Sequence, residues 1–158
     1  MEKLYRIEKD FLGEKRIELN KYYGIQTLRA KENFNITKTD ISLFPNFIKS
    51  LAKVKKACAL TNFELGDLTD IQKDAIVQAC NEIIDGKFHD QFIVDPIQGG
   101  AGTSTNMNAN EVIANRALEI LGKPKSSYDI IHPNNHINMS QSTNDVYPTA
   151  IKLTLHEL

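Results

Sequence analysis

The feature that most constrains the fold is a run of helical apolar spacing that carries its own start and stop signals. Apolar residues recur three and four positions apart across residues 71–84, which makes one wide face of a helix. Thr69 and Gln72 form a T-x-x-Q capping box before this face, and Gly86 suits a left-handed C-cap after it. The sequence therefore predicts a helix over about residues 70–85.

The segment over residues 45–65 shows the same helical spacing. Its apolar face is formed by residues four, three and four positions apart, namely Phe47, Leu51, Val54 and Cys58. The lysines of the segment occupy other positions of the helix, namely Lys49, Lys53, Lys55 and Lys56. Pro45 suits a first turn and Gly66 suits the stop, so we expect a helix from about Pro45 to Leu65.

Two more helices are predicted nearer the C-terminus. One runs over about residues 109–121, with Asn108 as its N-cap and with Gly122 and Pro124 after its end. The other begins near Thr143 and keeps its apolar spacing to the last residue. The chain is therefore expected to be mainly α-helical.

The first 45 residues contain short apolar alternations separated by turns. Residues 4–10 and 16–19 fit two short strands on either side of a break at residues 11–14. The Tyr-Tyr-Gly sequence at residues 22–24 indicates another turn. With 158 residues, the chain is expected to form little more than one domain, mainly α with a short extended or β region at its N-terminus.

Composition excludes several classes of protein. The 19 Lys and Arg residues nearly balance the 20 Asp and Glu residues, and a formal net charge of −1 argues against nucleic acid or anionic membranes as partners. No apolar run approaches the length of a membrane-spanning helix, and the N-terminus lacks the apolar stretch of a secretory signal. Cys58 and Cys80 are too few for a disulfide framework, and we interpret them as inert packing residues. We therefore expect a reduced, cytoplasmic protein.

Residues 96–110 carry no charge and are polar rather than apolar. Three glycines within residues 99–102 precede a predicted helix, so the segment resembles an anion-binding loop at a helix N-terminus. The loop contains no lysine and is therefore not a P-loop, and it does not match the G-x-G-x-x-G pattern. Binding of a small polar or anionic ligand is indicated, and nucleotide binding is not.

A second uncharged polar run covers residues 130–144. Ser142, Thr143 and Asn144 stand where the last helix should start, so free backbone N–H groups and side-chain donors would converge there on a carboxylate. The alternative is that both uncharged runs are ordinary turns and helix caps, because Asn, Ser, Thr and Gly favour such positions. Composition alone does not decide between these two interpretations.

Two histidines lie within the second run. His132 and His136 are four positions apart, but Pro133 prevents them from sharing a helical face, and neither a carboxylate nor a Cys adjoins them. We therefore expect no metal site and no other cofactor. A Ser–His–Asp triad stays open on composition, although no G-x-S-x-G sequence supports one.

The sequence resembles the aspartase/fumarase superfamily, and most closely its aspartate ammonia-lyase branch. The motifs that carry the resemblance extend over nearly the whole chain and are RIEKD (6–10), YYGIQTLRA (22–30), DPIQGGAGTS (95–104), NMNANEV (106–112) and QSTND (141–145). Fumarases typically have Ser in place of Ala101, and Ser-Ser-Asn in place of residues 142–144. Three departures are His132, which is more typical of fumarases, Asn135 where Asp is usual, and Met139 where Lys is common.

The resemblance implies an elimination that converts L-aspartate to fumarate and ammonia. The residues that match the family's substrate-binding positions are Thr103, Ser142, Thr143 and Asn144, and a possible secondary anion site falls on His132, Asn134 and Asn135. The family's base is a Ser in a mobile Gly-Ser-Ser loop that is absent here, so no catalytic residue is expected in this chain. The resemblance also implies a homotetramer with a bundle of long central helices, and a small dicarboxylate or amino-acid substrate.

The last predicted helix ends at Leu158 without a capping residue or a polar tail. We therefore expect a fragment that is inactive alone, with an N-terminal lyase domain over residues 1–141 and the truncated start of a central helical-bundle domain over residues 142–158. Its apolar face around Ile151, Leu155 and Leu158 is expected to be exposed. Two alternatives stay open: a class II fumarase that converts malate to fumarate and water, and a non-catalytic binding module of the same fold.

Overall fold

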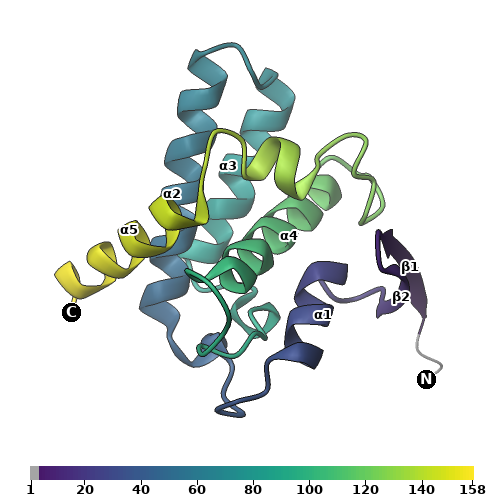
Figure 1. The fold of residues 1–158 in the computed structure, drawn as a ribbon. Coiled ribbons are helices and arrows are strands. Elements are labelled where there is room, and N and C mark those ends of the chain that lie inside the picture. The colour runs from purple at the N-terminus through teal and green to yellow at the C-terminus, as the bar shows by residue number, and fades with distance from the viewer. Residues whose placement is uncertain (1–3) are drawn as a thin grey trace.

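The computed structural model describes residues 4–158 and shows the mainly helical fold that the sequence predicts (Figure 1). Its elements, in chain order, are β1 (Tyr5–Asp10), β2 (Gly13–Glu18), α1 (Ile25–Asn33), η1 (Ile41–Leu43), α2 (Pro45–Glu64), α3 (Asp70–Ile84), η2 (His89–Gln91), α4 (Thr103–Ile120), η3 (Pro133–Ile137) and α5 (Thr143–His156). Within residues 4–158, no helix is both long enough and apolar enough to cross a membrane.

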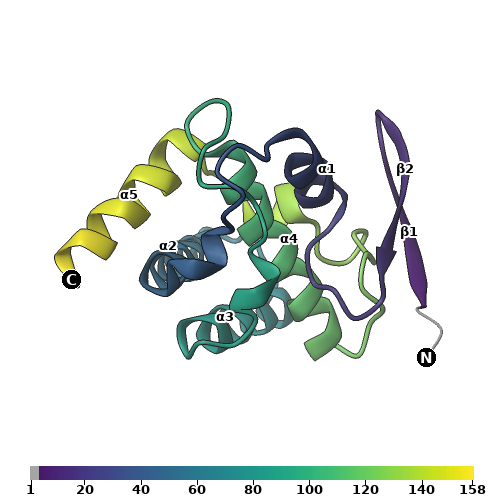
Figure 2. The ribbon, with the colours of Figure 1, turned by 90° about the horizontal axis from the view of Figure 1, so that it is seen from below.

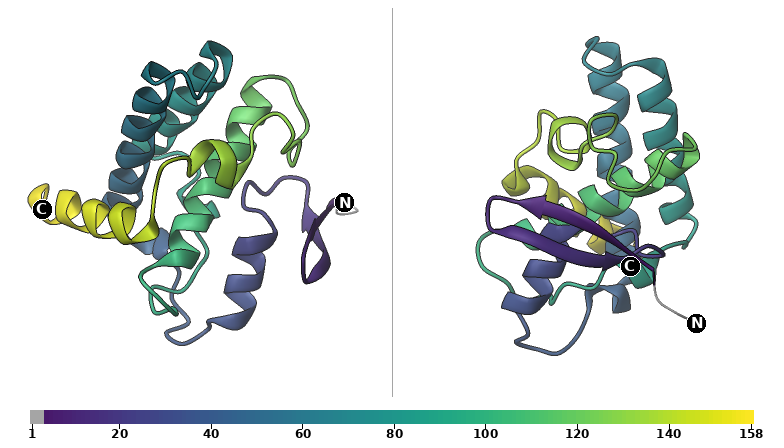
Figure 3. Two further views of the ribbon diagram at one scale, coloured as in Figure 1. Left: turned by 45° about the horizontal axis from the view of Figure 1, so that its top comes forward. Right: turned by 90° about the vertical axis from the view of Figure 1, so that its right-hand side faces the viewer.

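Helix α4 occupies the centre of the molecule. Helices α2 and α3 lie side by side as an antiparallel pair, and α4 packs against α3 and against α1. Helix α5 packs against α2, at the end of the molecule opposite to the β1–β2 hairpin (Figures 2 and 3). Helix α4 therefore lies between the hairpin and α5.

A large part of the hydrophobic core lies between α3 and α4, and buried residues of α2 such as Ile48 and Ala52 extend it. The α3 side chains that are completely buried there are Ile76, Ala79, Cys80 and Ile83. Those of α4 include Val112, Ile113, Ala117 and Leu118. Burial of an Ile or Leu side chain contributes about 1.5–3 kcal/mol, so this interface holds α4 firmly in place.

The predicted helices over residues 45–65 and 70–85 are confirmed as α2 and α3. The capping box is present, because the backbone N–H of Gln72 donates to Thr69 Oγ1 at 3.3 Å and the N–H of Thr69 donates to Gln72 Oε1 at 3.1 Å. Gly86 follows α3 with a φ of +95°, as its predicted left-handed C-cap requires. Local signals alone therefore locate this pair of helices.

The predicted N-terminal strands are confirmed as an antiparallel hairpin, in which Asp10 pairs with Gly13. The break between the strands is shorter than residues 11–14, because Gly13 and Glu14 already belong to β2. Gly13 adopts a φ of +111°, which glycine tolerates and which allows the chain to reverse after only two loop residues.

Helix α1 follows the predicted Tyr-Tyr-Gly turn and is missed by the sequence analysis. Its residues are mostly polar, and its N-cap, Gly24, has no side chain to signal a helix start. The carboxylates that cap α1 belong instead to Glu8 and Glu111, which accept hydrogen bonds from its first N–H groups. A cap supplied from such distant positions leaves no local sequence signal.

Candidate functional site

The glycine loop over residues 99–102 leads directly into α4. Gly102 is the N-cap with a φ of +86°, and α4 begins at Thr103, six residues before the predicted start. The prediction of Asn108 as the N-cap is wrong, because this residue lies in the second turn of α4. Its side chain accepts from Ile93 N at 3.0 Å and donates to the carbonyl of Gln91 at 3.0 Å. Thr103 therefore belongs to the first turn of α4.

The amide of Gln98 performs the capping that the sequence analysis assigned to Asn108. Gln98 Oε1 accepts from the backbone N–H of Thr105 at 2.9 Å, and Gln98 Nε2 donates to Thr105 Oγ1 at 2.8 Å. The N–H groups of Thr103 and Ser104 also lie in the first turn, where a helix offers no carbonyl partner. These groups and the positive end of the helix dipole face the loop, which favours an anion there.

Helix α5 begins at Thr143, as predicted. Ser142 is its N-cap, and Ser142 Oγ accepts from the backbone N–H of Asn144 at 3.2 Å. Thr143 is half-buried, whereas Ser142 and Asn144 are exposed. The sequence prediction of a helix start at residues 142–144 is therefore confirmed, with the three polar side chains around it.

The structure brings the two helix N-termini together in one pocket of about 270 Å³, which we name the Gly-loop pocket. It is lined by Pro96, Gln98, Gly100, Ala101, Gly102, Asn144, Tyr147 and Pro148. A Cβ on Gly102 would lie 2.1 Å from Tyr147 Cδ2, so the loop is in direct contact with α5. Glycine is required here by both the close approach and the left-handed φ.

A hydrogen bond from α4 orients the hydroxyl group of Thr143. Thr143 Oγ1 accepts a hydrogen bond from Asn106 Nδ2 at 3.3 Å. Because this oxygen accepts from within the protein, its own hydrogen remains available to a ligand. Thr103 is exposed, and its Oγ1 lies 3.5 Å from the position that a Cβ on Gly100 would take. Of the four predicted substrate-binding residues, Asn144 lines the Gly-loop pocket, whereas Thr103 and Thr143 are next in sequence to the lining residues Gly102 and Asn144, and Ser142 precedes them as the N-cap of α5. Their side chains are neutral donors, which stabilise negative charge without titrating.

The second group of predicted residues lies in a different place. His132 and Asn134 line a larger pocket of about 560 Å³, which we name the hairpin pocket. Its lining residues are Lys9, Asp10, Phe11, Ile25, Gln26, Met107, Glu111, Tyr128, His132, Pro133 and Asn134. Asn135 is exposed beside it. The Gly-loop pocket and the hairpin pocket share no lining residue.

His132 caps the short helix η3 rather than presenting a cation. Its Nδ1 accepts from the backbone N–H of Asn134 at 3.0 Å and of Asn135 at 3.3 Å. Burial lowers the pKa of His132, which favours the neutral ring that these hydrogen bonds require. His136 Nδ1 in turn accepts from the backbone N–H of His132 at 2.8 Å. The two rings are thus engaged in backbone capping.

Lys55 is a residue that the sequence analysis placed away from the apolar face of α2, and this placement is wrong. The residue is only 1% exposed, and burial lowers the pKa of Lys55 to about 7. Its Nζ donates to Asn138 Oδ1 at 3.0 Å and to Gln141 Oε1 at 2.8 Å. Lys55 lies four residues after the buried Leu51, and this spacing is the one sequence signal of its burial.

Glu111 is a second buried ionisable residue that the sequence analysis did not single out as a site. Its carboxylate accepts from the backbone N–H groups of Gly24 and Thr27 at 2.8 and 3.0 Å, and from Thr27 Oγ1 at 2.6 Å. Burial raises the pKa of Glu111 to about 7, and the nearby carboxylate of Glu8 acts in the same direction. Glu111 thereby fastens α1 to α4.

Glu8 ties the hairpin to the same region. It forms a buried ion pair with Arg6 at 2.9 Å, and it accepts hydrogen bonds from Ile25 N and Ser126 Oγ. Arg6 also donates to the backbone carbonyl of Tyr23 at 2.7 Å. This cluster explains how a two-stranded hairpin, which is marginal alone, stays attached to the helices.

The thiols are buried packing groups, as predicted. Cys80 is completely buried and Cys58 is half-buried. Burial raises the pKa of both thiols, that of Cys80 to about 12, so both stay protonated at neutral pH. Within residues 4–158, no group of three or more His, Cys, Asp or Glu side chains is placed to hold a metal ion.

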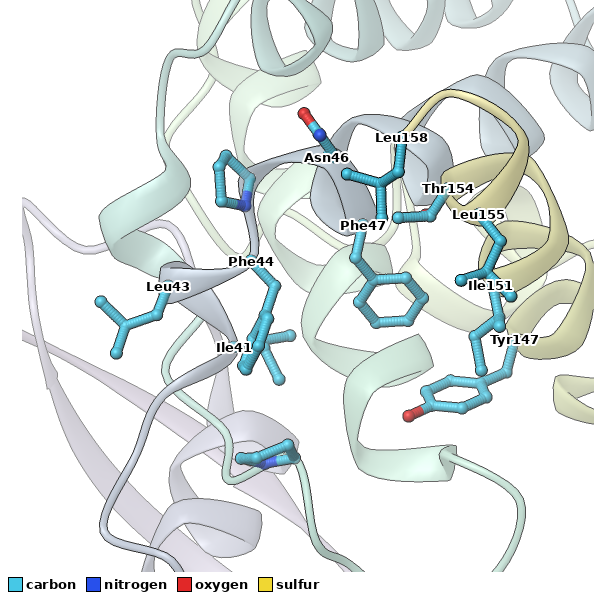
Figure 4. Close-up of a pocket in the computed structure, with 12 residues that line it drawn as sticks. Ile41, Leu43, Phe44, Asn46, Phe47, Tyr147, Ile151, Thr154, Leu155 and Leu158 are labelled. Carbon is cyan, nitrogen blue, oxygen red and sulfur yellow. The ribbon is translucent and has the colours of Figure 1, made fainter.

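An apolar groove of about 400 Å³ lies between α5 and the start of α2 (Figure 4). Phe44, Phe47 and Tyr147 line it together with the predicted apolar face of α5. That face is exposed as predicted, with Ile151 at 37%, Leu155 at 67% and Leu158 at 84% exposure. The groove has few polar groups, so the chemistry of a small polar ligand is better served by the Gly-loop pocket.

Comparison with known proteins places this geometry in context. Residues 13–158 match the family described as Lyase. The chain is 60% identical over 152 residues to the aspartate ammonia-lyase of Helicobacter pylori, covering 96% of this chain and 32% of that protein. It is 62% identical over 157 residues to the aspartate ammonia-lyase of Bacillus subtilis, covering 99% of this chain and 33% of that protein. The chain therefore spans about a third of the length of these curated relatives.

Solved structures show the same fold. A fumarate lyase:delta crystallin from Brucella melitensis matches with a TM-score of 0.94 at 56% identity, over 98% of this chain and 36% of that one. A recombinant class II fumarase from Schistosoma mansoni matches with a TM-score of 0.88 at 41% identity, over 96% of this chain and 32% of that one. The chain thus shares its fold with proteins named fumarate lyase and class II fumarase.

Proposed function

The chain belongs to the Lyase family, and on this premise we propose that it is the N-terminal part of an aspartate ammonia-lyase, which converts L-aspartate to fumarate and ammonia. The observation that carries the proposal is the Gly-loop pocket. Two helix N-termini meet there with neutral donors around them, in a chain 60% identical to curated aspartate ammonia-lyases. These features are what a dicarboxylate substrate requires.

The chemical difficulty of the reaction is the weak acidity of the proton that must leave. This proton lies next to a carboxylate, and its removal produces a carbanion whose charge spreads into that carboxylate. Donors that strengthen their hydrogen bonds to the resulting dianion lower the barrier, each by about 3 kcal/mol in comparable oxyanion holes. We assign this role to Thr103, Ser142, Thr143 and Asn144 and to the N–H groups of the first turns of α4 and α5.

Neutral donors suit this step because they do not titrate. Their hydrogen bonds strengthen as negative charge grows on the substrate carboxylate. The side chains of Thr103, Ser142, Thr143 and Asn144 are all neutral. His132, Asn134 and Asn135 stay assigned to a possible secondary anion site, since they lie in the separate hairpin pocket or beside it.

The rest of the proposed enzyme follows from the relatives rather than from this chain. The chain spans about a third of their length, so we propose that the base and the remaining substrate contacts lie outside residues 1–158. We further propose the division at residue 141, with α5 as the beginning of a helical bundle that forms a homotetramer. The proposal includes a cytoplasmic location and a role in amino-acid metabolism.

A class II fumarase is the second candidate, and a specific observation favours it. The Schistosoma mansoni fumarase shares this fold at 41% identity over 96% of the chain. In favour of the ammonia-lyase, the curated aspartate ammonia-lyases are 60% and 62% identical to the chain. The Ser-Thr-Asn sequence at residues 142–144 supports the same choice, since fumarases typically carry Ser-Ser-Asn there.

The test is a side-by-side assay of the full-length protein that carries this chain. Fumarate formation is followed with L-aspartate and with L-malate, and the isolated chain of residues 1–158 serves as the matched control. We expect fumarate from L-aspartate with the full-length protein and none with the isolated chain. Fumarate from L-malate alone would establish the fumarase instead, and turnover by the isolated chain would contradict the proposal that the base lies elsewhere.

A further inference from the structure

The interior of the molecule contains a lysine with an unusual environment. Lys55 on α2 is 1% exposed, and within residues 4–158 its ammonium group has no carboxylate partner. Buried lysines are normally paired with an acid, because an unpaired charge is costly to remove from water. The two partners of Lys55 are instead the side-chain oxygens of Asn138 and Gln141, at 3.0 and 2.8 Å.

Both partners belong to the turn that leads into α5. Asn138 Nδ2 donates to the carbonyl of Gln141 at 3.1 Å, and Gln141 Nε2 donates to the carbonyls of Ile137 and Met139. Ser140 within the turn has a φ of +60°, a conformation that residues with a Cβ seldom adopt. The turn is therefore held in place by its side-chain hydrogen bonds, and Lys55 lies at the point where they meet.

A chain of hydrogen bonds continues from this turn to Thr143. Asn138 Oδ1, which accepts from Lys55, also accepts from Asn106 Nδ2 at 2.9 Å. Asn106 Nδ2 donates in addition to Thr143 Oγ1 at 3.3 Å. Lys55 is thus connected through Asn138 and Asn106 to the hydroxyl that the proposed function places on the substrate, and the connection joins α2, α4 and the start of α5.

The network depends on donors that converge on one acceptor. Asn138 Oδ1 receives Lys55, Asn106 and also Asn110 Nδ2 at 3.3 Å. The Oδ1 atoms of Asn106 and Asn110 have no hydrogen-bond partner among the described residues, so both amides are oriented by what their nitrogens reach. A neutral apolar residue at position 55 would leave the oxygen of Gln141 without its Lys55 donor and release the turn.

We propose that Lys55 is a positioning residue of the substrate site: through Asn138 and Gln141 it fixes the turn before α5, and through Asn138 and Asn106 it keeps the Thr143 hydroxyl aimed at the substrate carboxylate. This inference rests on the proposed function. It assigns Lys55 no contact with the substrate and no proton transfer.

A double-mutant cycle on the full-length protein tests this proposal. Thr143→Val alone removes the donor and should lower kcat/KM for L-aspartate about tenfold. Lys55→Met alone should lower kcat/KM by a similar factor, because the same donor loses its orientation. In the Lys55→Met background, Thr143→Val should cost less than about twofold, since an unoriented hydroxyl contributes little.

Two controls separate positioning from a general loss of stability. Ile76→Ala removes a completely buried side chain of α3, outside this network of hydrogen bonds, and should lower the melting temperature without altering the effect of Thr143→Val. If Lys55→Met does not fold, Asn138→Ala interrupts the same connection and is used in the cycle with the same expectation. Additive effects of Thr143→Val with either network variant would overturn the proposal.

The outcomes also separate this inference from the proposed function. If the unmodified full-length protein forms no fumarate from L-aspartate, the proposed function fails. If it forms fumarate and the cycle is additive, Lys55 is only a structural residue and the inference fails while the function stands. If it forms fumarate and the cycle is strongly non-additive, both are supported.

Discussion

The Gly-loop pocket and the hairpin pocket differ in the kind of polar group that lines them. The Gly-loop pocket is built from glycines, amides and a tyrosine around two helix N-termini. The hairpin pocket contains the ionisable side chains of Lys9, Asp10, Glu111 and His132. One pocket offers an uncharged set of donors. The other contains ionisable side chains, of which Asp10 and Glu111 are already hydrogen-bonded within the protein.

The difference shows how the molecule divides two tasks. The charges near the hairpin hold elements together: Glu111 caps α1, and Asp10 pairs with Arg29 at 2.7 Å. The neutral donors of the Gly-loop pocket are largely exposed and hold little structure besides their own helix caps. We therefore expect substitutions in the hairpin pocket to affect stability and substitutions around the Gly-loop pocket to affect catalysis.

The largest expected effect is on stability, from Glu111→Ala. This change leaves the buried N–H groups of Gly24 and Thr27 and the Thr27 hydroxyl without an acceptor, and it should cost about 3–5 kcal/mol of unfolding free energy. Urea unfolding of the chain measures it. Glu111→Gln, which keeps one side-chain oxygen, is the matched control and should cost less. A loss below about 1 kcal/mol for Glu111→Ala would show that α1 is held in another way.

The next largest expected effect is a pH dependence of the unfolding free energy that arises from Glu111. Its pKa is raised from 4.5 to about 7 in the folded chain, so folding takes up a proton between these two pH values. The contribution of Glu111 to stability is therefore complete below pH 4.5 and is lost as pH rises to about 7, by roughly 3 kcal/mol. The difference in unfolding free energy between Glu111→Gln and the unmodified chain should change across this window. A difference that is constant with pH would refute the assignment.

Two glycine variants test the contact between the Gly loop and Tyr147 of α5. Gly66 and Gly102 share a φ of +86°, but only Gly102 faces the Tyr147 ring, whereas a Cβ on Gly66 would meet no described atom within 4 Å. Gly66→Ala should cost about 1 kcal/mol from backbone strain alone. Gly102→Ala should cost about 1–3 kcal/mol more, because Tyr147 must move. Equal losses in thermal unfolding would mean that the contact with Tyr147 is loose.

The smallest expected effect on stability comes from Thr143→Val. It should change the unfolding free energy by less than about 1 kcal/mol, because Ser142 caps α5 and Asn106 keeps its bond to Asn138. Turnover by the full-length protein should nevertheless fall about tenfold. Thr149→Val, at an exposed position of the same helix, is the control and should leave turnover unchanged. A large loss of stability with Thr143→Val would favour a purely structural role for this residue.

Local signals in the sequence predict much of the fold. The capping box of Thr69 and Gln72 and the glycine at position 86 define α3, and the apolar spacing defines α2 and α5. What the sequence analysis misses depends on contacts between distant residues. The start of α4 is determined by Gln98 reaching Thr105, and α1 is capped by Glu111, which lies more than 80 positions along the chain.

The sequence likewise indicates some residues of the candidate site and not others. The uncharged runs predict the Gly loop and residues 142–144, because runs without charge stand out in a sequence whose residues are 25% charged. The buried charges do not stand out, since Lys55 lies among other lysines. Only the packing of α2 against α3, α4 and α5 reveals that Lys55, alone among the lysines of α2, is buried.

The most direct measurement is a crystal structure of the full-length protein with fumarate bound. We predict a carboxylate at the N-termini of α4 and α5, within hydrogen-bond distance of Thr143 Oγ1 and of side chains or N–H groups at Thr103 and Asn144. Fumarate bound only in the hairpin pocket, beside His132 and Asn134, would contradict the central claim that neutral donors at the Gly-loop pocket hold the substrate.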